Sequence, residues 1–134
     1  IRAGAMEIVP VPVKHGRLPI LGYRFGSIAY LTDVKTIPET SLPLLRDLDV
    51  LVLTALRKHL HPAHMSLEEA LTAVELLQPR HTLFTHVAHD MGRYEVVAPT
   101  LPPNVDLATD GLRVVVDDKS GHADPVRFEP SERY

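Results

Sequence analysis

The chain has 134 residues, of which 45% are hydrophobic and 23% are charged, and its formal net charge is −3. These values are typical of one soluble globular domain, and they exclude the strongly basic surface that coating duplex nucleic acid requires. Because the chain has no cysteine, disulfides and thiolate ligands are excluded, and any metal site must use histidine, aspartate or glutamate. No apolar run is long enough to span a membrane and no signal-peptide pattern occurs, so we expect no membrane partner and a cytoplasmic location.

The first part of the chain is predicted to form β-structure. Glu7–Lys14 alternates and is rich in β-branched residues, and its two prolines favour a position at a sheet edge. We expect a loop over Gly16–Gly22 and then a hairpin of two strands, Gly22–Phe25 and Ile28–Thr32. The second of these is an apolar run that ends on Asp33, which is typical of a strand covered on both faces.

The middle of the chain alternates helices with strands. A short helix is expected within Thr36–Asp47, followed by a buried strand over Asp49–Thr54. Ser66–Leu77 opens with the Ser-x-x-Glu pattern of a capping box and continues with a 3.6-residue apolar stripe, which predicts an α-helix. The next strand is His81–His86. This order of elements predicts an α/β fold in which helices pack on a mixed β-sheet.

Near the carboxyl terminus, the Asp-Gly pair at positions 110 and 111 predicts a hairpin between strands Val105–Ala108 and Leu112–Val116. Residues 117–134 are polar and contain two prolines, so we expect an extended or poorly ordered tail. The chain is therefore expected to divide into a domain over residues 1–116 and a polar tail over residues 117–134.

Histidines are numerous, with eight in the chain, and several follow predicted strands. His15 and His86 each close a strand, as Asp33 does, and functional side chains tend to collect at the carboxyl ends of strands in α/β sheets. Imidazole and carboxylate are ligands that zinc and manganese accept. We therefore predict a metal site from His15, Asp33 and His86. Taken singly, each residue has a plain structural explanation: a surface histidine before a turn, a helix cap and a sheet-end histidine.

His64 lies in the loop before the helix that Ser66 caps, and we expect its side chain to face the same end of the sheet. Its imidazole could protonate a leaving alkoxide, because histidine ordinarily titrates near working pH. The alternative is a loop histidine without a special role. His89 could contact a substrate phosphate, and His59 and His61 are expected at solvated loop positions.

Five short runs carry a resemblance to a known family: Val11–Gly16, Gly22–Phe25, Tyr30–Asp33, Ala63–Ser66 and Phe84–His89. In order and spacing they resemble the metallo-β-lactamase-fold hydrolases, most of all the cyclic phosphodiesterases of the phosphonate-utilisation type, with tRNA 3′-processing endonucleases as more distant kin. The resemblance implies an αββα-type fold. It also implies that His15 holds one metal ion, that Asp33 bridges two ions, that His86 holds the second, and that His64 donates a proton or contacts phosphate.

The resemblance implies a function as well. We expect a metal-dependent hydrolase with two divalent ions, zinc or manganese, that acts on a small cyclic or nucleotide-like phosphodiester by attack of a metal-bound hydroxide. The family's first metal motif, His-x-His-x-Asp-His, does not occur in this sequence. The chain is therefore expected to be the carboxyl-terminal half of the fold. An amino-terminal half or a homodimer partner would then complete the site, and the chain alone could be inactive, with its metal partial or absent. The alternatives are a thioester or lactone hydrolase on the same fold and a non-catalytic α/β fragment or subunit.

Overall fold

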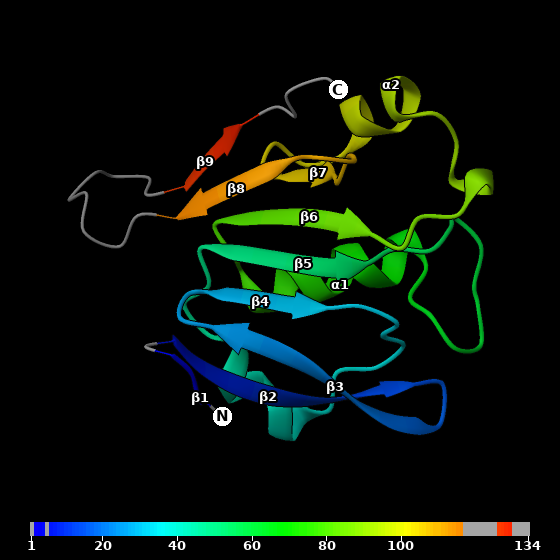
Figure 1. Ribbon diagram of the computed structural model, residues 1–134. Coiled ribbons are helices and arrows are strands. Elements are labelled where there is room, and N and C mark those ends of the chain that lie inside the picture. The colour runs from blue at the N-terminus through cyan, green and yellow to red at the C-terminus, as the bar shows by residue number, and fades with distance from the viewer. Residues whose placement is uncertain (1, 5, 117–125, 130–134) are drawn as a thin grey trace.

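The computed structural model of the chain describes residues 2–4, 6–116 and 126–129. Within these residues, seven strands form one sheet in their order along the chain (Figure 1). The predicted α/β class with a mixed sheet is confirmed. The strands are β1 (Arg2–Ala3), β2 (Met6–His15), β3 (Leu18–Phe25), β4 (Ile28–Leu31), β5 (Val50–Thr54), β6 (His81–Thr85) and β7 (Val105–Leu107).

The directions of the strands bring several carboxyl ends together. β3 is antiparallel to both β2 and β4, whereas β4, β5, β6 and β7 are parallel to one another. β2 therefore runs in the same direction as β4 to β7. The carboxyl ends of these five strands meet at one end of the sheet, on the right of Figure 1, which we call the site rim.

The helix α1 (Leu67–Leu77) packs behind the sheet in the view of Figure 1. The predicted capping box is present, because the Ser66 hydroxyl accepts from the backbone N–H of Glu69 while the Glu69 carboxylate accepts from that of Ser66. α1 and the sheet share one core, to which the buried residues Leu31, Leu53 and Phe84 belong. The helix expected within residues 36–47 is a 3₁₀ helix, η1 (Glu39–Leu45), and it contains Pro43, which lacks a backbone N–H donor.

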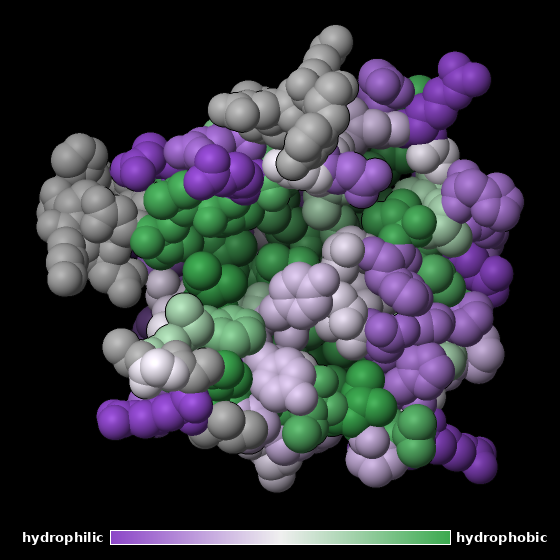
Figure 2. All heavy atoms as spheres, in the orientation of Figure 1, coloured by the Kyte–Doolittle hydropathy of each residue, from purple (hydrophilic) through white to green (hydrophobic). Residues whose placement is uncertain are grey.

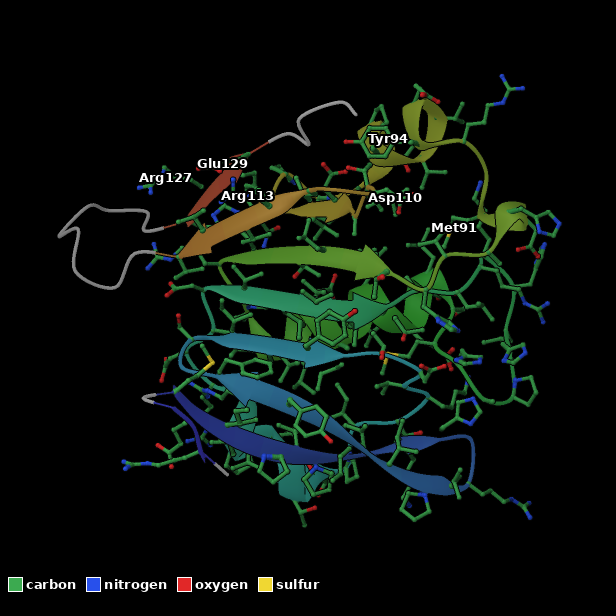
Figure 3. The ribbon with its side chains drawn as sticks, viewed as in Figure 1. Met91, Tyr94, Asp110, Arg113, Arg127 and Glu129 are labelled. Carbon is green, nitrogen blue, oxygen red and sulfur yellow. The ribbon has the colours of Figure 1, made fainter. Side chains whose placement is uncertain are left out.

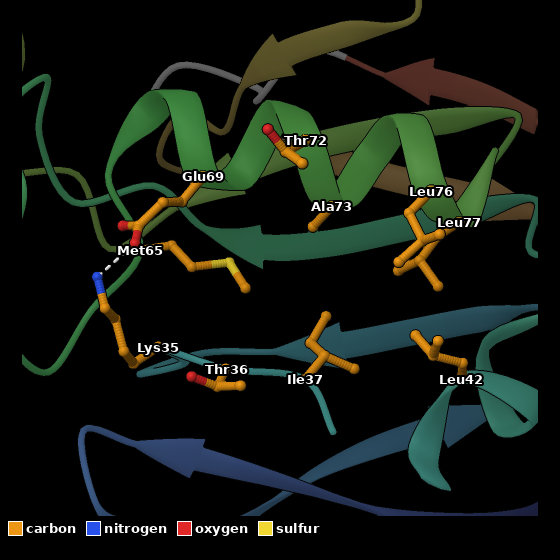
Figure 4. A pocket seen from close by; sticks show the side chains of 10 residues that line it. All are labelled: Lys35, Thr36, Ile37, Leu42, Met65, Glu69, Thr72, Ala73, Leu76 and Leu77. Carbon is orange, nitrogen blue, oxygen red and sulfur yellow. Dashed lines mark hydrogen bonds and ion pairs between the residues drawn. The ribbon is translucent and has the colours of Figure 1, made fainter. Parts of the chain in front are cut away.

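A groove of about 280 Å³ lies between α1 and the segment that follows β4 (Figure 4). Apolar side chains such as Ile37, Leu42 and Leu76 line it, and an ion pair between Lys35 and Glu69 stands at one end. Burial by itself would raise the pKa of Glu69, but hydrogen bonds from Lys35 and Ser66 outweigh it, so this pKa lies below its ordinary value. Glu69 therefore both caps α1 and joins the helix to the chain that leaves β4.

The loop expected over residues 16–22 is wrong. β3 begins at Leu18, directly opposite His15, so β2 and β3 form a long hairpin. Gly16 makes the tight turn with φ of 58°, a left-handed conformation that glycine adopts without steric cost. Pro19 pairs with Lys14 inside the hairpin.

The hairpin predicted between the strands around residues 105–108 and 112–116 is also wrong. β7 pairs with β6, whereas β8 (Arg113–Val116) pairs with β9 (Val126–Glu129) in a separate two-stranded sheet. Figure 3 shows Arg113 and Glu129 on these neighbouring strands, where they form an ion pair at 3.6 Å. The Asp-Gly pair does turn the chain. The strand before this turn, β7, pairs with β6 and not with the strand that follows the turn. Of the expected tail, β9 is a strand, and residues 117–125 and 130–134 lie outside the described residues.

Three short helical segments connect β6 with β7: η2 (His89–Met91), α2 (Tyr94–Val97) and η3 (Ala98–Thr100). Met91 and Tyr94 are labelled in Figure 3. Met91 is fully buried, and the Tyr94 hydroxyl donates to Asp106 of β7 at 2.9 Å. That hydrogen bond raises the pKa of Tyr94. No helix in the described part of the chain is long and apolar enough to cross a membrane.

Candidate metal centre

Four segments of the chain deliver polar side chains to the site rim. His15 is the last residue of β2, and Asp33 comes two residues after the end of β4. The loop after β5 carries His61 and His64, and His86 directly follows β6. Because these strands run in the same direction, residues far apart in the sequence come together at one place.

Each of the residues His15, Asp33, His64 and His86 lies within 4 Å of at least one of the others. The Nε2 atoms of His15 and His64 are 3.3 Å apart, and Nε2 of His86 lies 3.4 Å from Oδ1 of Asp33. The same aspartate oxygen lies 3.9 Å from Nδ1 of His64. The structure therefore brings together all three residues predicted as metal ligands and the histidine predicted as proton donor.

The set of side chains that could hold a single ion differs from the sequence expectation. One ligand atom each of His15, Asp33 and His64 lie within 4.8 Å of one another, so His64 occupies the place in this set that was expected for His86. The ring centroid of His64 is 4.6 Å from that of His15 and 4.7 Å from that of His86. His64 thus lies between the two other histidines. Although it belongs to a loop and not to a strand end, its side chain is near enough to His15 and Asp33 to share an ion with them.

Asp33 and His86 share an unusual backbone conformation. Their φ angles are 59° and 57°, in the left-handed region that few residues other than glycine adopt. Such a residue costs about 1–3 kcal/mol of backbone strain and persists only where the surrounding structure fixes it, which is frequent at functional sites. The chain bends at each of these two positions, just where a polar side chain stands at the site rim.

Backbone hydrogen bonds hold the loop of His64 against the neighbouring strands. The N–H of Gly16 donates to the carbonyl of Ala63 at 3.1 Å, and the N–H of Met65 donates to the carbonyl of Val34 at 2.8 Å. These bonds lie on the two sides of His64 and join it to the residues that follow His15 and Asp33. A Cβ at Gly16 would lie 3.4 Å from the backbone oxygen of Pro62, an ordinary van der Waals distance, so the positive φ of Gly16 is what favours glycine.

The residues at the site rim fit a divalent metal ion. The side chain of His64 is only 13% exposed, and its Nδ1 has no hydrogen-bond partner among the described residues. Burial lowers the pKa of His64, as do the neighbouring histidines, with Asp33 acting in the opposite direction. A histidine must be neutral to bind a metal, and nitrogen and oxygen donors without sulfur suit zinc or manganese.

The other histidines are placed differently. His89 is exposed in η2, three residues beyond His86, and its contact with a substrate stays a prediction. His59 is exposed, as expected, but the solvated position expected for His61 is wrong. His61 is half-buried, and its Nδ1 accepts hydrogen bonds from two backbone N–H groups of its own loop. The two N–H groups lie two and three residues after His61 in the sequence. A side chain that accepts at this spacing closes a turn, a role usually considered only for Asn, Asp, Ser and Thr.

Comparison with known proteins identifies the family. The family described as Beta-lactamase superfamily domain matches residues 1–87, and the chain belongs to it. A crystal structure of a new diphosphatase from the PhnP family is similar, with a TM-score of 0.81 and 46% sequence identity. That similarity covers 84% of this chain and 44% of the diphosphatase. The metallo-β-lactamase-type fold expected from the sequence is confirmed, and the chain corresponds to about half of it.

Two further crystal structures share the fold at lower identity. The short form of human tRNase Z has a TM-score of 0.61 at 19% identity, over 82% of this chain and 43% of that one. The metallo-β-lactamase-fold protein YhfI from Bacillus subtilis has a TM-score of 0.62 at 20% identity, over 81% of this chain and 49% of that one.

A relative was also found by sequence. An octanoyltransferase from Porphyromonas gingivalis (strain ATCC BAA-308 / W83) is 31% identical over 115 residues, which are 85% of this chain and 23% of that protein. The chain spans less than half the length of each of these relatives.

Proposed function

We propose that the complete protein is a metal-dependent hydrolase that cleaves a small phosphodiester. The observation that carries this proposal is the convergence of an aspartate and three histidines within 3.3–3.9 Å of their neighbours at the site rim. Membership of the β-lactamase superfamily and the 46% identity to a diphosphatase support it. The three strand-end residues and the loop histidine then take different parts in the reaction.

His15, Asp33 and His86 are the proposed metal ligands. His15 would hold one ion, His86 would hold a second, and Asp33 would be a ligand to both. Divalent zinc or manganese, when bound, would acidify water and neutralise charge on the phosphoryl group. The residues themselves contribute fixed positions, because the left-handed backbone at Asp33 and His86 and the hydrogen bonds around the loop leave them little freedom.

His64 is the proposed proton donor of the complete protein. In the chain alone, His64 lies with His15 and Asp33 in the set of side chains that could hold a single ion, so there we propose it as a ligand. The oxygen of water attacks phosphorus and its proton passes to solvent. The bond from phosphorus to the leaving oxygen breaks, and that oxygen takes a proton from the protonated imidazole, which becomes neutral. In the substrate-free site the pKa of His64 is lowered, chiefly by burial, so the neutral ring is favoured. A phosphate anion beside the ring acts in the opposite direction and favours the protonated form. His64 therefore takes up its proton together with the substrate, and His89 is a further proposed contact to the phosphate.

Two observations bear on the substrate class: the net charge of the chain and its sequence identity to the diphosphatase. A chain with a net charge of −3 has no excess of cations for binding a long polyanion, which favours a small or nucleotide-like substrate. The 46% identity to a diphosphatase makes a substituted diphosphate the second candidate. In both substrates the reacting phosphorus has two bridging oxygens, so the same residues can act on either.

Further polypeptide is needed to complete this site. The side chains of Asp33 and His86 are 47% and 38% exposed, and the chain covers only 44% of the diphosphatase. The sheet face opposite α1, which faces the viewer in Figure 2, carries the exposed side chains of Leu21, Tyr23 and Tyr30. We propose that an amino-terminal half of the same fold covers this face and adds the missing ligands. A homodimer is the alternative that light scattering would reveal.

The proposal is tested on the complete protein with zinc or manganese and bis-p-nitrophenyl phosphate. His64→Ala is expected to lower kcat by about 10²–10⁴, the usual contribution of general acid catalysis. His59→Ala, on the same loop, is the control and should leave kcat unchanged. An unaffected rate in His64→Ala would refute the proton-donor role. Turnover of a thioester or lactone in place of the phosphodiester would favour the alternative hydrolase, and absence of both metal and turnover would favour the non-catalytic fragment.

A further inference from the structure

We infer that His61 is a positioning residue that fixes the backbone of His64. The Nδ1 atom of His61 accepts a hydrogen bond from the N–H of Ala63 and another from the N–H of His64, each at 3.2 Å. His61 precedes these groups by two and three residues. A side-chain acceptor at this spacing closes a tight turn, as an aspartate or asparagine oxygen does in an Asx turn.

The hydrogen bonds define which nitrogen of His61 acts. Nδ1 must keep its lone pair free to accept, so a neutral ring has its proton on Nε2. The ring of His61 also lies beside that of His64, with the centroids 4.9 Å apart and the planes tilted by 33°. His61 therefore contacts His64 in two ways, by a hydrogen bond to its backbone N–H and by packing of the two rings. We assign the positioning of His64 to the backbone hydrogen bonds.

The consequence for the site follows from the loop. The bonds from Gly16 and Met65 fix the residues on either side of His64, whereas the N–H of His64 itself is held by His61. The side chain of His64 must be placed closely, since its nitrogens lie 3.3 Å from His15 and 3.9 Å from Asp33. Loss of the Nδ1 acceptor would let the turn open and would displace the imidazole from both neighbours.

The effect on metal binding and turnover rests on the proposed function, but the backbone role does not. Two substitutions separate the acceptor from the ring: His61→Asn keeps an acceptor at the same place and removes the ring, and His61→Phe keeps a ring and removes the acceptor. His59→Ala is the control on the same loop. For the metal-free chain we would measure amide hydrogen exchange at Ala63 and His64 by NMR, and then the zinc dissociation constant by calorimetry.

In His61→Phe we expect exchange at the Ala63 and His64 amides to accelerate about tenfold, while amides of α1 stay unchanged, and zinc to bind about tenfold more weakly. In His61→Asn both quantities should stay within about threefold of the wild type, because the acceptor is retained. Wild-type exchange rates in His61→Phe would overturn the inference, as would His61→Asn behaving like His61→Phe. If no variant, wild type included, binds zinc, the proposed function fails instead, and the exchange rates still decide the role of His61.

Discussion

At the scale of single residues, the site depends on backbone conformations that are costly to adopt. Asp33 and His86 both have positive φ, and each stands at the end of a parallel strand beside the other's side chain. Aspartate and histidine enter the left-handed region more readily than most residues. A substitution at either position can therefore have two effects, the loss of a candidate ligand atom and a change in backbone strain. Asp33→Asn separates these effects, because asparagine tolerates the same backbone conformation and only the carboxylate is lost.

The ion pair between Lys35 and Glu69 gives a pH dependence of stability. The pKa of Glu69 in the folded chain lies below its ordinary value of 4.5, so the ionised form is stabilised on folding. Its contribution is complete above that ordinary value and is lost as the pH falls through the lowered value. Glu69→Gln keeps a capping residue and removes the charge.

We expect Glu69→Gln to lower the free energy of unfolding by about 0.5 kcal/mol at pH 7, since the pair is partly exposed. The difference from the wild type should shrink toward zero in acid. Urea denaturation at pH 7 and pH 3 measures both values. A difference that stayed the same at the two pH values would show that the charge of Glu69 is not responsible.

At the scale of elements, close packing between β3 and β4 depends on Gly22. A Cβ at this position would lie 2.3 Å from Cδ2 of Leu31, which is fully buried, and 3.1 Å from the backbone oxygen of Tyr30. Gly22→Ala is therefore expected to destabilise the chain by about 1–3 kcal/mol, the usual cost of overpacking. Leu21→Ala, at the exposed neighbouring position, should cost less than about 0.5 kcal/mol. Chemical denaturation measures both variants, and equal effects would argue against the steric explanation.

Elements specified by local sequence were predictable, and elements specified by distant pairing were not. The capping box and apolar stripe of α1 lie within one segment, so the sequence was sufficient there. The predicted strand Gly22–Phe25 and its hairpin with β4 are confirmed. Residues 18–21 and Val126–Glu129 become strands because of their partners, β2 and β8, which no local signal identifies. The Asp-Gly turn near residue 110 showed where the chain turns, but the parallel pairing of β7 with β6 decided what it pairs with.

The same distinction applies to the site. His15, Asp33 and His86 follow apolar runs, and strand ends in an α/β sheet are places where functional side chains can be expected. The position of His64 between the other histidines depends on the loop path, which the bonds from Gly16 and Met65 set. His61 was missed because histidine is seldom considered as a turn-closing acceptor, although its ring nitrogen accepts at the same spacing as an asparagine oxygen.

At the scale of the whole molecule, the parallel direction of β2 and β4 to β7 collects the polar strand ends at the site rim, while the sheet face opposite α1 remains partly apolar. The chain spans 44% of a similar diphosphatase, and under the proposed function it holds part of the site of a longer protein. Under that proposal, the chain itself contributes a group of candidate ligands on a fixed scaffold. The first requirement of the proposed function is therefore that these ligands bind a metal ion together.

The most direct test is calorimetric titration of the chain with zinc, comparing the wild type with Asp33→Asn. We expect the wild type to bind zinc through His15, Asp33 and His64, and Asp33→Asn to bind it at least about tenfold more weakly with an unchanged thermal unfolding midpoint. A wild-type chain that binds no zinc, or an Asp33→Asn variant that binds it equally well, would contradict the assignment of this site.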